Sequence, residues 1–297
     1  MSARNISFVK EFFIVGFPGL QTEYYGTVAA LLFFVYVCIL VGNGIFLVIF
    51  TLEKCLHKPM YYVILNLVVS DILFSTTTLP KIITRYWFQA GSISFSGCFI
   101  QMYFVHYFGS VNAFILAVMA FDRYVAICHP LRYLNILTKS NIFYLLMAIR
   151  AYPLPYCAEN TIMHCYCDHI SITSLACTNR ALYSVPAFAF AMVVLLSPLT
   201  FIVFSYCTII VAVLRISSAQ GRMKTFSTCS PQLVIIALYF LPRCFIYLAS
   251  NIGINFSTDL RLVIIMMYSL FPPMINPLIY CLRTKDVKES LLKRLKI

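Results

Sequence analysis

Residues 25–50 read YGTVAALLFFVYVCILVGNGIFLVIF, an apolar stretch without a single charged residue. A helix of about 18 to 20 apolar residues is long enough to cross the hydrocarbon core of a bilayer. The whole chain of 297 residues is 61% hydrophobic and 11% charged, whereas a typical soluble domain has about 25% charged residues. The sequence therefore predicts an integral membrane protein.

Similar apolar stretches recur along the chain, separated by short polar segments. Together they predict seven membrane-spanning helices, at residues 25–52, 60–79, 99–127, 142–154, 186–214, 226–249 and 262–280. The expected fold is an all-α membrane protein, a bundle of seven transmembrane helices that forms a single domain over residues 1–297.

The fourth predicted helix is too short. Only 17 residues lie between Lys139 and Cys157, and Arg150, Pro153 and Pro155 interrupt them. A spanning helix needs about 20 uninterrupted apolar residues, which this segment does not have, and we expect that about 12 or more residues are missing. Either the bilayer is thinned there and the truncated fourth helix is stretched or re-entrant, or this is a defective gene product or a faulty gene model.

The basic residues predict the orientation in the membrane. Of the 22 Lys and Arg residues, 14 lie in the four segments 53–58, 122–141, 215–224 and 281–297, which alternate with the apolar stretches. Cytoplasmic segments carry such an excess of positive charge. We therefore expect a multi-pass plasma-membrane protein with an extracellular N-terminus, residues 1–24, and a cytoplasmic tail, residues 281–297.

Several further features agree with this orientation. No cleavable signal peptide is apparent in residues 1–21, and Asn5 begins a glycosylation sequon ahead of the first span. The tail is a short, basic, amphipathic stretch that suits anionic membrane lipid. Although the net charge is +12, no basic groove interleaved with aromatic residues is present, so nucleic acid is not an expected partner.

Cysteines gather in the longest connection between spans. Residues 157–184 contain four of the 12 cysteines, which on the oxidising side of a membrane indicates disulfides, and Cys98 is an available partner. A zinc site built from His164, Cys165, Cys167 and His169 is the less favoured alternative. No cofactor or metal is otherwise expected.

Polar residues inside the predicted spans need a physical reason, because burying them in lipid is costly. They are Asn43, Asp71, Ser110, Arg243 and Asn276. One interpretation is that they form hydrogen bonds between helices. Their order along the chain favours a more specific interpretation.

Four short motifs occur in order: Gly-Asn at 42–43, Ser-Asp at 70–71, Asp-Arg-Tyr at 122–124 and PMINPLIY at 273–280. Together they resemble the signature of rhodopsin-type G-protein-coupled receptors. The longer block MAFDRYVAICHPLRY at 119–133 is similar to the motif of olfactory receptors, and the blocks at 58–61, 205–206 and 224–229 match that family too. LPRCF at 241–245 and CLRTK at 281–285 most resemble the fish-type branch.

The resemblance implies an odorant receptor that activates a heterotrimeric G protein of the stimulatory olfactory type. It also implies two disulfides, Cys98–Cys167 and Cys157–Cys177, and polar core positions at Asn43 and Asp71. Coupling and activation would involve Asp122, Arg123, Tyr124, Tyr206, Asn276, Pro277 and Tyr280.

A small odorant would then bind in the outer half of the bundle. The expected pocket residues are His106, Gly109, Ser110, Phe190, Val194, Arg243 and Tyr247. Arg243 lies about 9 Å from the outer end of its helix, where a guanidinium needs an anion, a cavity or a route to the surface. An acidic odorant is therefore a hypothesis, and snorkelling or an internal bond is the alternative. Tyr247, four residues on, is expected to share the helix face of Arg243.

Other functions are less favoured. A small transporter often has internal repeats and glycine-rich broken helices, whereas this chain has no repeat and 10 glycines. An enzyme is not expected, because no nucleophile-and-base or metal motif lies in the spans. A receptor of the same architecture for a non-odorant ligand stays open.

Overall fold

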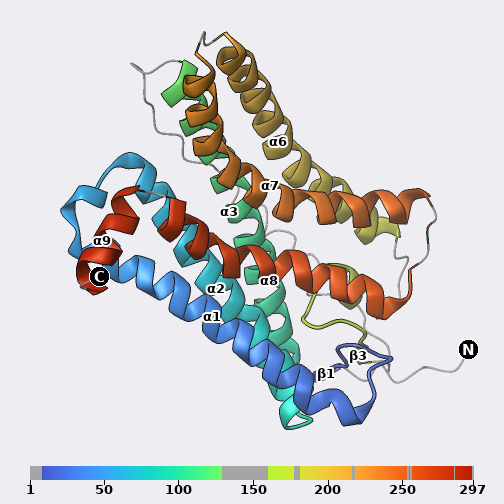
Figure 1. Ribbon diagram of the computed structural model, residues 1–297. Coiled ribbons are helices and arrows are strands. Elements are labelled where there is room, and N and C mark those ends of the chain that lie inside the picture. Colours follow the sequence, from blue (N-terminus) through green and yellow to red (C-terminus); the bar gives the residue numbers. More distant parts are fainter. Residues whose placement is uncertain are drawn as a thin grey trace, which may run out of the picture.

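The structure is a computed structural model that describes residues 9–128, 160–176, 181–215, 218–252, 254, 256–283 and 285–295. Its long helices pack as a bundle (Figure 1): α1 (Tyr25–Leu52), α2 (Pro59–Trp87), α3 (Phe95–Cys128), α6 (Ala181–Leu214), α7 (Ala219–Ile252) and α8 (Thr258–Arg283). Four shorter helices accompany them, η1 (Thr22–Tyr24), η2 (Lys54–Leu56), α5 (His169–Thr173) and α9 (Lys285–Leu295). The predicted fourth span at 142–154 lies outside the described residues.

Five helices in the described part are long and apolar enough to cross a membrane: Thr22–Leu52, Met60–Trp87, Phe95–Val125, Phe188–Leu214 and Thr258–Tyr280. Helix α7 contains a shorter apolar stretch, Gln232–Ile246, because its first turns carry Arg222 and Lys224. The predicted boundaries of α1 agree with the structure. The predicted end of the second span at Leu79 is wrong.

Helix α2 instead continues through Pro80 to Trp87. Proline removes one backbone hydrogen bond, but a transmembrane helix tolerates this where neighbouring groups satisfy the backbone. Gln101 of α3 contacts this turn, because its side-chain amide donates to the Thr77 carbonyl at 2.8 Å, next to the Thr76 carbonyl that Pro80 leaves without its helical donor. The helix is therefore longer than its apolar sequence suggests.

Buried polar residues connect the helices at the centre of the bundle. The Asn43 amide donates to the carbonyl of Pro273, 3.0 Å away on α8. The Asp71 carboxylate accepts hydrogen bonds from Asn112 of α3 at 3.0 Å and from Asn276 of α8 at 2.7 Å. Four of the long helices therefore meet through hydrogen bonds in a region where water is scarce.

A small sheet, not predicted from the sequence, lies at the end of the bundle opposite α9 (Figure 1). Strand β1 (Glu11–Ile14) is central, antiparallel to β2 (Ser92–Ser94) and parallel to β3 (Thr161–Ile162). Phe12 and Ile14 of β1 are fully buried. The segment before α1 is therefore part of the packed structure at this end.

Arg85 and Tyr86 at the end of α2 hold this N-terminal segment. The Arg85 Nε donates to the Ile14 carbonyl at 3.1 Å, and the Phe17 amide donates to the Tyr86 hydroxyl at 2.7 Å. Between these contacts the chain turns at Gly16, whose φ is +80°. That backbone conformation favours glycine.

We expect Gly16→Ala to lower the free energy of unfolding by about 1–3 kcal/mol. An added Cβ would lie 2.2 Å from the Tyr86 hydroxyl oxygen and would also strain the left-handed backbone. Thermal melting of the purified receptor measures the loss. Gly26→Ala is the control, because its Cβ would meet nothing within 4 Å; equal melting temperatures for the two variants would contradict the prediction.

Candidate functional site

A cavity of about 390 Å³ opens between the helices near the sheet. Its wall includes six of the seven predicted pocket residues, His106, Gly109, Ser110, Phe190, Val194 and Arg243. Helices α3, α6, α7 and α8 contribute to it, together with the loop at residues 163–174. The side chain of Tyr247, the seventh predicted residue, lies outside the described part.

A disulfide fixes the loop over this cavity. It joins Cys98 at the start of α3 to Cys167, which is the pair that the family resemblance implies. The Gln101 side chain accepts a hydrogen bond from the Cys167 amide at 2.9 Å. One residue further, the Asp168 carboxylate lies 3.5 Å from Nε2 of His106. The predicted pair Cys157–Cys177 lies outside the described residues.

The disulfide also bears on the zinc alternative, because it removes Cys167 from the proposed ligands. Among the described residues, no group of three or more His, Cys, Asp or Glu side chains is arranged to hold a metal ion. Burial raises the pKa of the neighbouring Cys165 thiol to about 12, so this side chain stays a neutral thiol. What the structure shows for this loop is that its residues line one side of the cavity.

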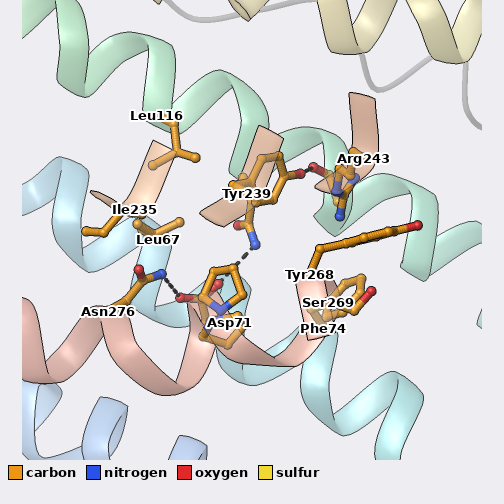
Figure 2. Close-up of a pocket in the computed structure, with 14 residues that line it drawn as sticks. Leu67, Asp71, Phe74, Leu116, Ile235, Tyr239, Arg243, Tyr268, Ser269 and Asn276 are labelled. Carbon is orange, nitrogen blue, oxygen red and sulfur yellow. Dashed lines mark hydrogen bonds between the residues drawn. The ribbon is translucent and has the colours of Figure 1, made fainter. Parts of the chain in front are cut away.

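Two aromatic rings hold the guanidinium of Arg243. Its central carbon lies 4.3 Å from the ring centroid of Tyr239 and 4.7 Å from that of Tyr268 on α8, which are favourable cation–π distances. Figure 2 shows both rings beside Arg243. The Tyr239 hydroxyl donates to the Gly109 carbonyl of α3, so its ring is itself fixed in place.

Helix geometry explains why Tyr239 contacts Arg243. Side chains on a helix point back toward its N-terminus, so a long side chain covers the turn before its own Cα. Tyr239 lies four residues before Arg243, whereas the predicted neighbour, Tyr247, lies four residues after it. This directional rule was the available signal for Tyr239, but nothing in the sequence placed Tyr268 beside it.

The charged groups of the cavity wall are mostly basic. The wall includes Arg243 and Arg261, a single carboxylate, Asp168, and three histidines, His106, His164 and His169. The side of α6 is apolar, with Phe188, Phe190, Ala191, Val194 and Leu195. A cavity with a cation at one place and an apolar wall suits a small organic molecule that carries a negative charge.

A second, much smaller cavity of about 10 Å³ lies deeper in the bundle. It shares six wall residues with the large cavity: Phe74, Gly109, Tyr239, Arg243, Tyr268 and Ser269. Its remaining wall includes Asp71, Asn112 and Asn276, and Figure 2 shows the hydrogen bond between Asn276 and Asp71. The two cavities are therefore neighbours separated by Arg243 and its tyrosines.

The residues predicted for coupling and activation lie toward the end of the bundle that bears α9. Asp122 is buried, and the Arg123 guanidinium donates to the Met60 sulfur at 2.8 Å. The Tyr280 hydroxyl lies 3.9 Å from the Met119 sulfur. The other members are Tyr124, Tyr206, Asn276 and Pro277, of which all but Tyr124 are buried.

Two of the cavity histidines give the loop a pH dependence. Burial lowers the pKa of His164 and of His169 below the ordinary value of 6.5. Asp168 opposes the shift at both residues, whereas His106 adds to it at both and Arg261 adds to it at His164. At a pH between the lowered value and 6.5 the unfolded loop binds more protons than the folded loop, so folding weakens as the pH falls.

We therefore expect amide hydrogen exchange in residues 161–176 to become faster, relative to intrinsic rates, as the pH falls below about 6.5. Above that pH the folded loop has its full stability. The variant His164→Gln/His169→Gln should lose most of this dependence, because neither replacement titrates. A dependence that persists unchanged in the variant would show that other groups cause it.

Comparisons with known proteins extend these observations. The sequence profile described as olfactory receptor matches residues 32–296. Human olfactory receptor 2AT4 is 38% identical over 95% of this chain and 92% of its own length, and rat olfactory receptor 1468 is 33% identical over 99% and 96%. The alignment with human olfactory receptor 52B2, at 35% identity, spans 309 positions, whereas this chain has 297 residues.

The fold matches a solved structure as well. Squid rhodopsin aligns with a TM-score of 0.68 at 17% identity and covers 96% of this chain and 90% of its own. The bundle is thus a multi-pass membrane protein with the seven-helix fold of rhodopsin-like receptors, and it is a receptor rather than an enzyme. Within that class, the chain belongs to the olfactory receptor family.

Proposed function

We propose that this chain is an odorant receptor that recognises small organic anions, such as carboxylates or sulfates, in the cavity of about 390 Å³. The observation that carries this proposal is Arg243, held between the rings of Tyr239 and Tyr268 on the cavity wall. A guanidinium presents a rigid fork of donors that matches a carboxylate. The apolar residues of α6 would contact the rest of the ligand.

Snorkelling is the weaker interpretation of Arg243. A snorkelling side chain extends along apolar surface and keeps its charged end in water. The guanidinium instead lies over two tyrosine rings between α7 and α8, on the walls of both cavities. This position favours recognition of a charged group from inside the bundle.

We propose that ligand binding is transmitted to a G protein of the stimulatory olfactory type, which raises cyclic AMP. The residues expected to take part are Asp122, Arg123, Tyr124, Tyr206, Asn276, Pro277 and Tyr280. Support comes from the position of most of these residues toward the α9 end, away from the odorant cavity, while Asn276 lies on the wall of the small cavity beside it. The contact of Arg123 with Met60 joins α3 to α2, so outward movement of a helix there would free Arg123 for a partner.

We propose the plasma membrane as the location, with residues 1–24 and the cavity outside and residues 281–297 inside. The distribution of basic residues and the loop disulfide support this orientation. Asn5 would then be accessible for glycosylation. Helix α9 buries Val287 and exposes Lys288 and Lys293, a pattern that suits an anionic lipid surface. The chain would form a single receptor domain over residues 1–297.

We also propose that the fourth span of this chain is shortened. The alignment of 309 positions with a human relative requires at least 12 gaps in this chain, as expected if residues are missing. A non-signalling truncated receptor is therefore the second candidate function. The narrower assignment to the fish-type branch stays a prediction.

One experiment tests the proposed function. A tagged receptor is expressed in cells, its surface level is measured, and cyclic AMP is recorded against pairs of odorants that share a carbon skeleton and differ as acid and alcohol. We expect each acid to activate the receptor at a lower concentration than the matching alcohol. A parallel chain with the fourth span restored to about 20 apolar residues separates the two candidates. If only that chain reaches the surface and responds, the natural chain is the non-signalling form.

A further inference from the structure

The wall of the large cavity carries a carboxylate as well as the guanidinium of Arg243. Among the described wall residues, Asp168 of the disulfide loop is the one acidic side chain, and this side chain is 23% exposed. A carboxylate repels an anionic ligand. Its presence on the wall of an anion site therefore asks what part of a ligand it would bind.

Both charges are held in position by their neighbours. Asp168 directly follows Cys167, which is tied to α3 by the disulfide and by the hydrogen bond to Gln101. Arg243 lies over the rings of Tyr239 and Tyr268. Groups that are already ordered lose little freedom when a ligand binds to them, so both charges are prepared for binding.

Asp168 and Arg243 also act on the same neighbours. Burial has the largest effect on the Tyr166 phenol and raises its pKa, Asp168 raises this pKa further, and Arg243 lowers it. Both charges act on the imidazole of His106 as well. Because Coulomb interactions weaken with distance, the two charges lie around the same part of the cavity.

Helix α3 shows how the two charges are offset. The Asp168 carboxylate lies 3.5 Å from Nε2 of His106. Arg243 contacts Tyr239, whose hydroxyl donates to the Gly109 carbonyl, three residues further along α3. Three residues correspond to a rise of about 4.5 Å. The carboxylate is thus about one helical turn nearer the outer end than the guanidinium, and a short aliphatic chain spans such an offset.

The contact with His106 leaves Asp168 its charge. This contact is an ion pair only when His106 is protonated, and 3.5 Å is long for a hydrogen bond. With a neutral His106, Asp168 presents a negative charge to the cavity. An ammonium group has three N–H donors for such a carboxylate, and the ring of Tyr166, on the same wall, offers it an aromatic face.

We propose that the cavity recognises small amino acids in their zwitterionic form, with the ligand carboxylate on Arg243 and the ligand ammonium on Asp168. This inference rests on the proposed anion site at Arg243 and adds a second charged group to the ligand. The apolar side chains of α6 would contact the methylene groups between the two charges.

The test compares straight-chain ω-amino acids of increasing length with plain acids and alcohols of the same skeleton. The melting temperature of the purified full-length receptor reports binding without signalling, because a ligand that binds the folded state raises it. We expect the best amino acid to give the same rise as its plain acid at about one-tenth of the concentration or less, since hydrogen bonds to charged groups are the strong ones.

Asp168→Asn separates the two charged groups of the ligand. It removes the charge that holds the ammonium and that repels a plain acid, so amino acids should need higher concentrations than with the wild type, and plain acids lower ones. Loss of stability alone does not produce opposite shifts. Asp259→Asn is the matched control, because the Asp259 carboxylate accepts a hydrogen bond from the Gly19 amide, and this variant should keep the wild-type order.

Two results would overturn the inference, and they differ in what they mean for the anion site. If plain acids stabilise the wild type as well as amino acids do, and better than alcohols, the inference fails and the anion site stands. If acids and alcohols act equally, the anion site fails and the inference fails with it. Should Asp168→Asn not fold, the wild-type comparison of plain acids with amino acids still decides.

Discussion

Replacing Arg243 by glutamine is expected to weaken the cyclic AMP response to acidic odorants by about 30-fold or more. Truncating one partner of a buried, hydrogen-bonded charge pair costs about 2–5 kcal/mol, and about 1.4 kcal/mol corresponds to each factor of ten. Glutamine keeps hydrogen-bond donors near the two tyrosine rings but removes the charge. The measured quantity is the half-maximal concentration for each acid, with surface expression determined in parallel.

The response to alcohols of the same skeleton separates recognition from folding. If Arg243 recognises the anion, any alcohol response changes little while the acid response falls. Arg261→Gln is the matched control, because Arg261 also lines the cavity but is exposed to solvent, where charge interactions are weaker. An equal loss for acids and alcohols in Arg243→Gln would show that the residue only supports the fold.

Much of the fold could be predicted because lipid imposes a simple rule. Every backbone group must be satisfied inside the bilayer, so long apolar stretches are helices, and α1 occupies the predicted residues 25–52. The ends were less predictable. Helix α2 continues through Pro80 to Trp87, and Gln101 of the neighbouring helix bonds to the same turn, a contact between residues distant in sequence.

The sheet was missed for a related reason. Strands β1, β2 and β3 have 4, 3 and 2 residues, too few for a recognisable alternation of apolar and polar residues. They are brought together by the ends of helices and by the disulfide loop. Their pairing depends on tertiary structure, which local sequence does not encode.

The residues of the cavity wall also divide into those that could be predicted from the sequence and those that could not. Counting from the motifs led to His106 and Ser110, because residues four apart share a helix face, and Arg243 was singled out by its charge inside a span. The partners supplied by other segments, Tyr268 from α8 and Asp168 from the loop, had no such signal. Both are set by packing between segments that are far apart in the chain.

The disulfide is the covalent link on which this packing depends, and its removal is expected to have the largest effect on stability. Cys98 and Cys167 are both fully buried and lie 69 residues apart in the chain. Closing a loop of that length in the unfolded chain corresponds to about 4 kcal/mol. Cys98→Ala/Cys167→Ala should lower the melting temperature by about 10 °C and reduce the surface level sharply.

Ligand recognition should fail together with stability, because Cys167 adjoins Asp168 on the cavity wall. Without the disulfide, the loop would keep the Gln101 hydrogen bond and the contact between His106 and Asp168, which are weaker than a covalent link. Cys165→Ala is the matched control, because it removes a buried, unbridged thiol from the same loop. If the double variant melts no lower than Cys165→Ala, the loop is held by its noncovalent contacts, and the cavity would not need the disulfide for its shape.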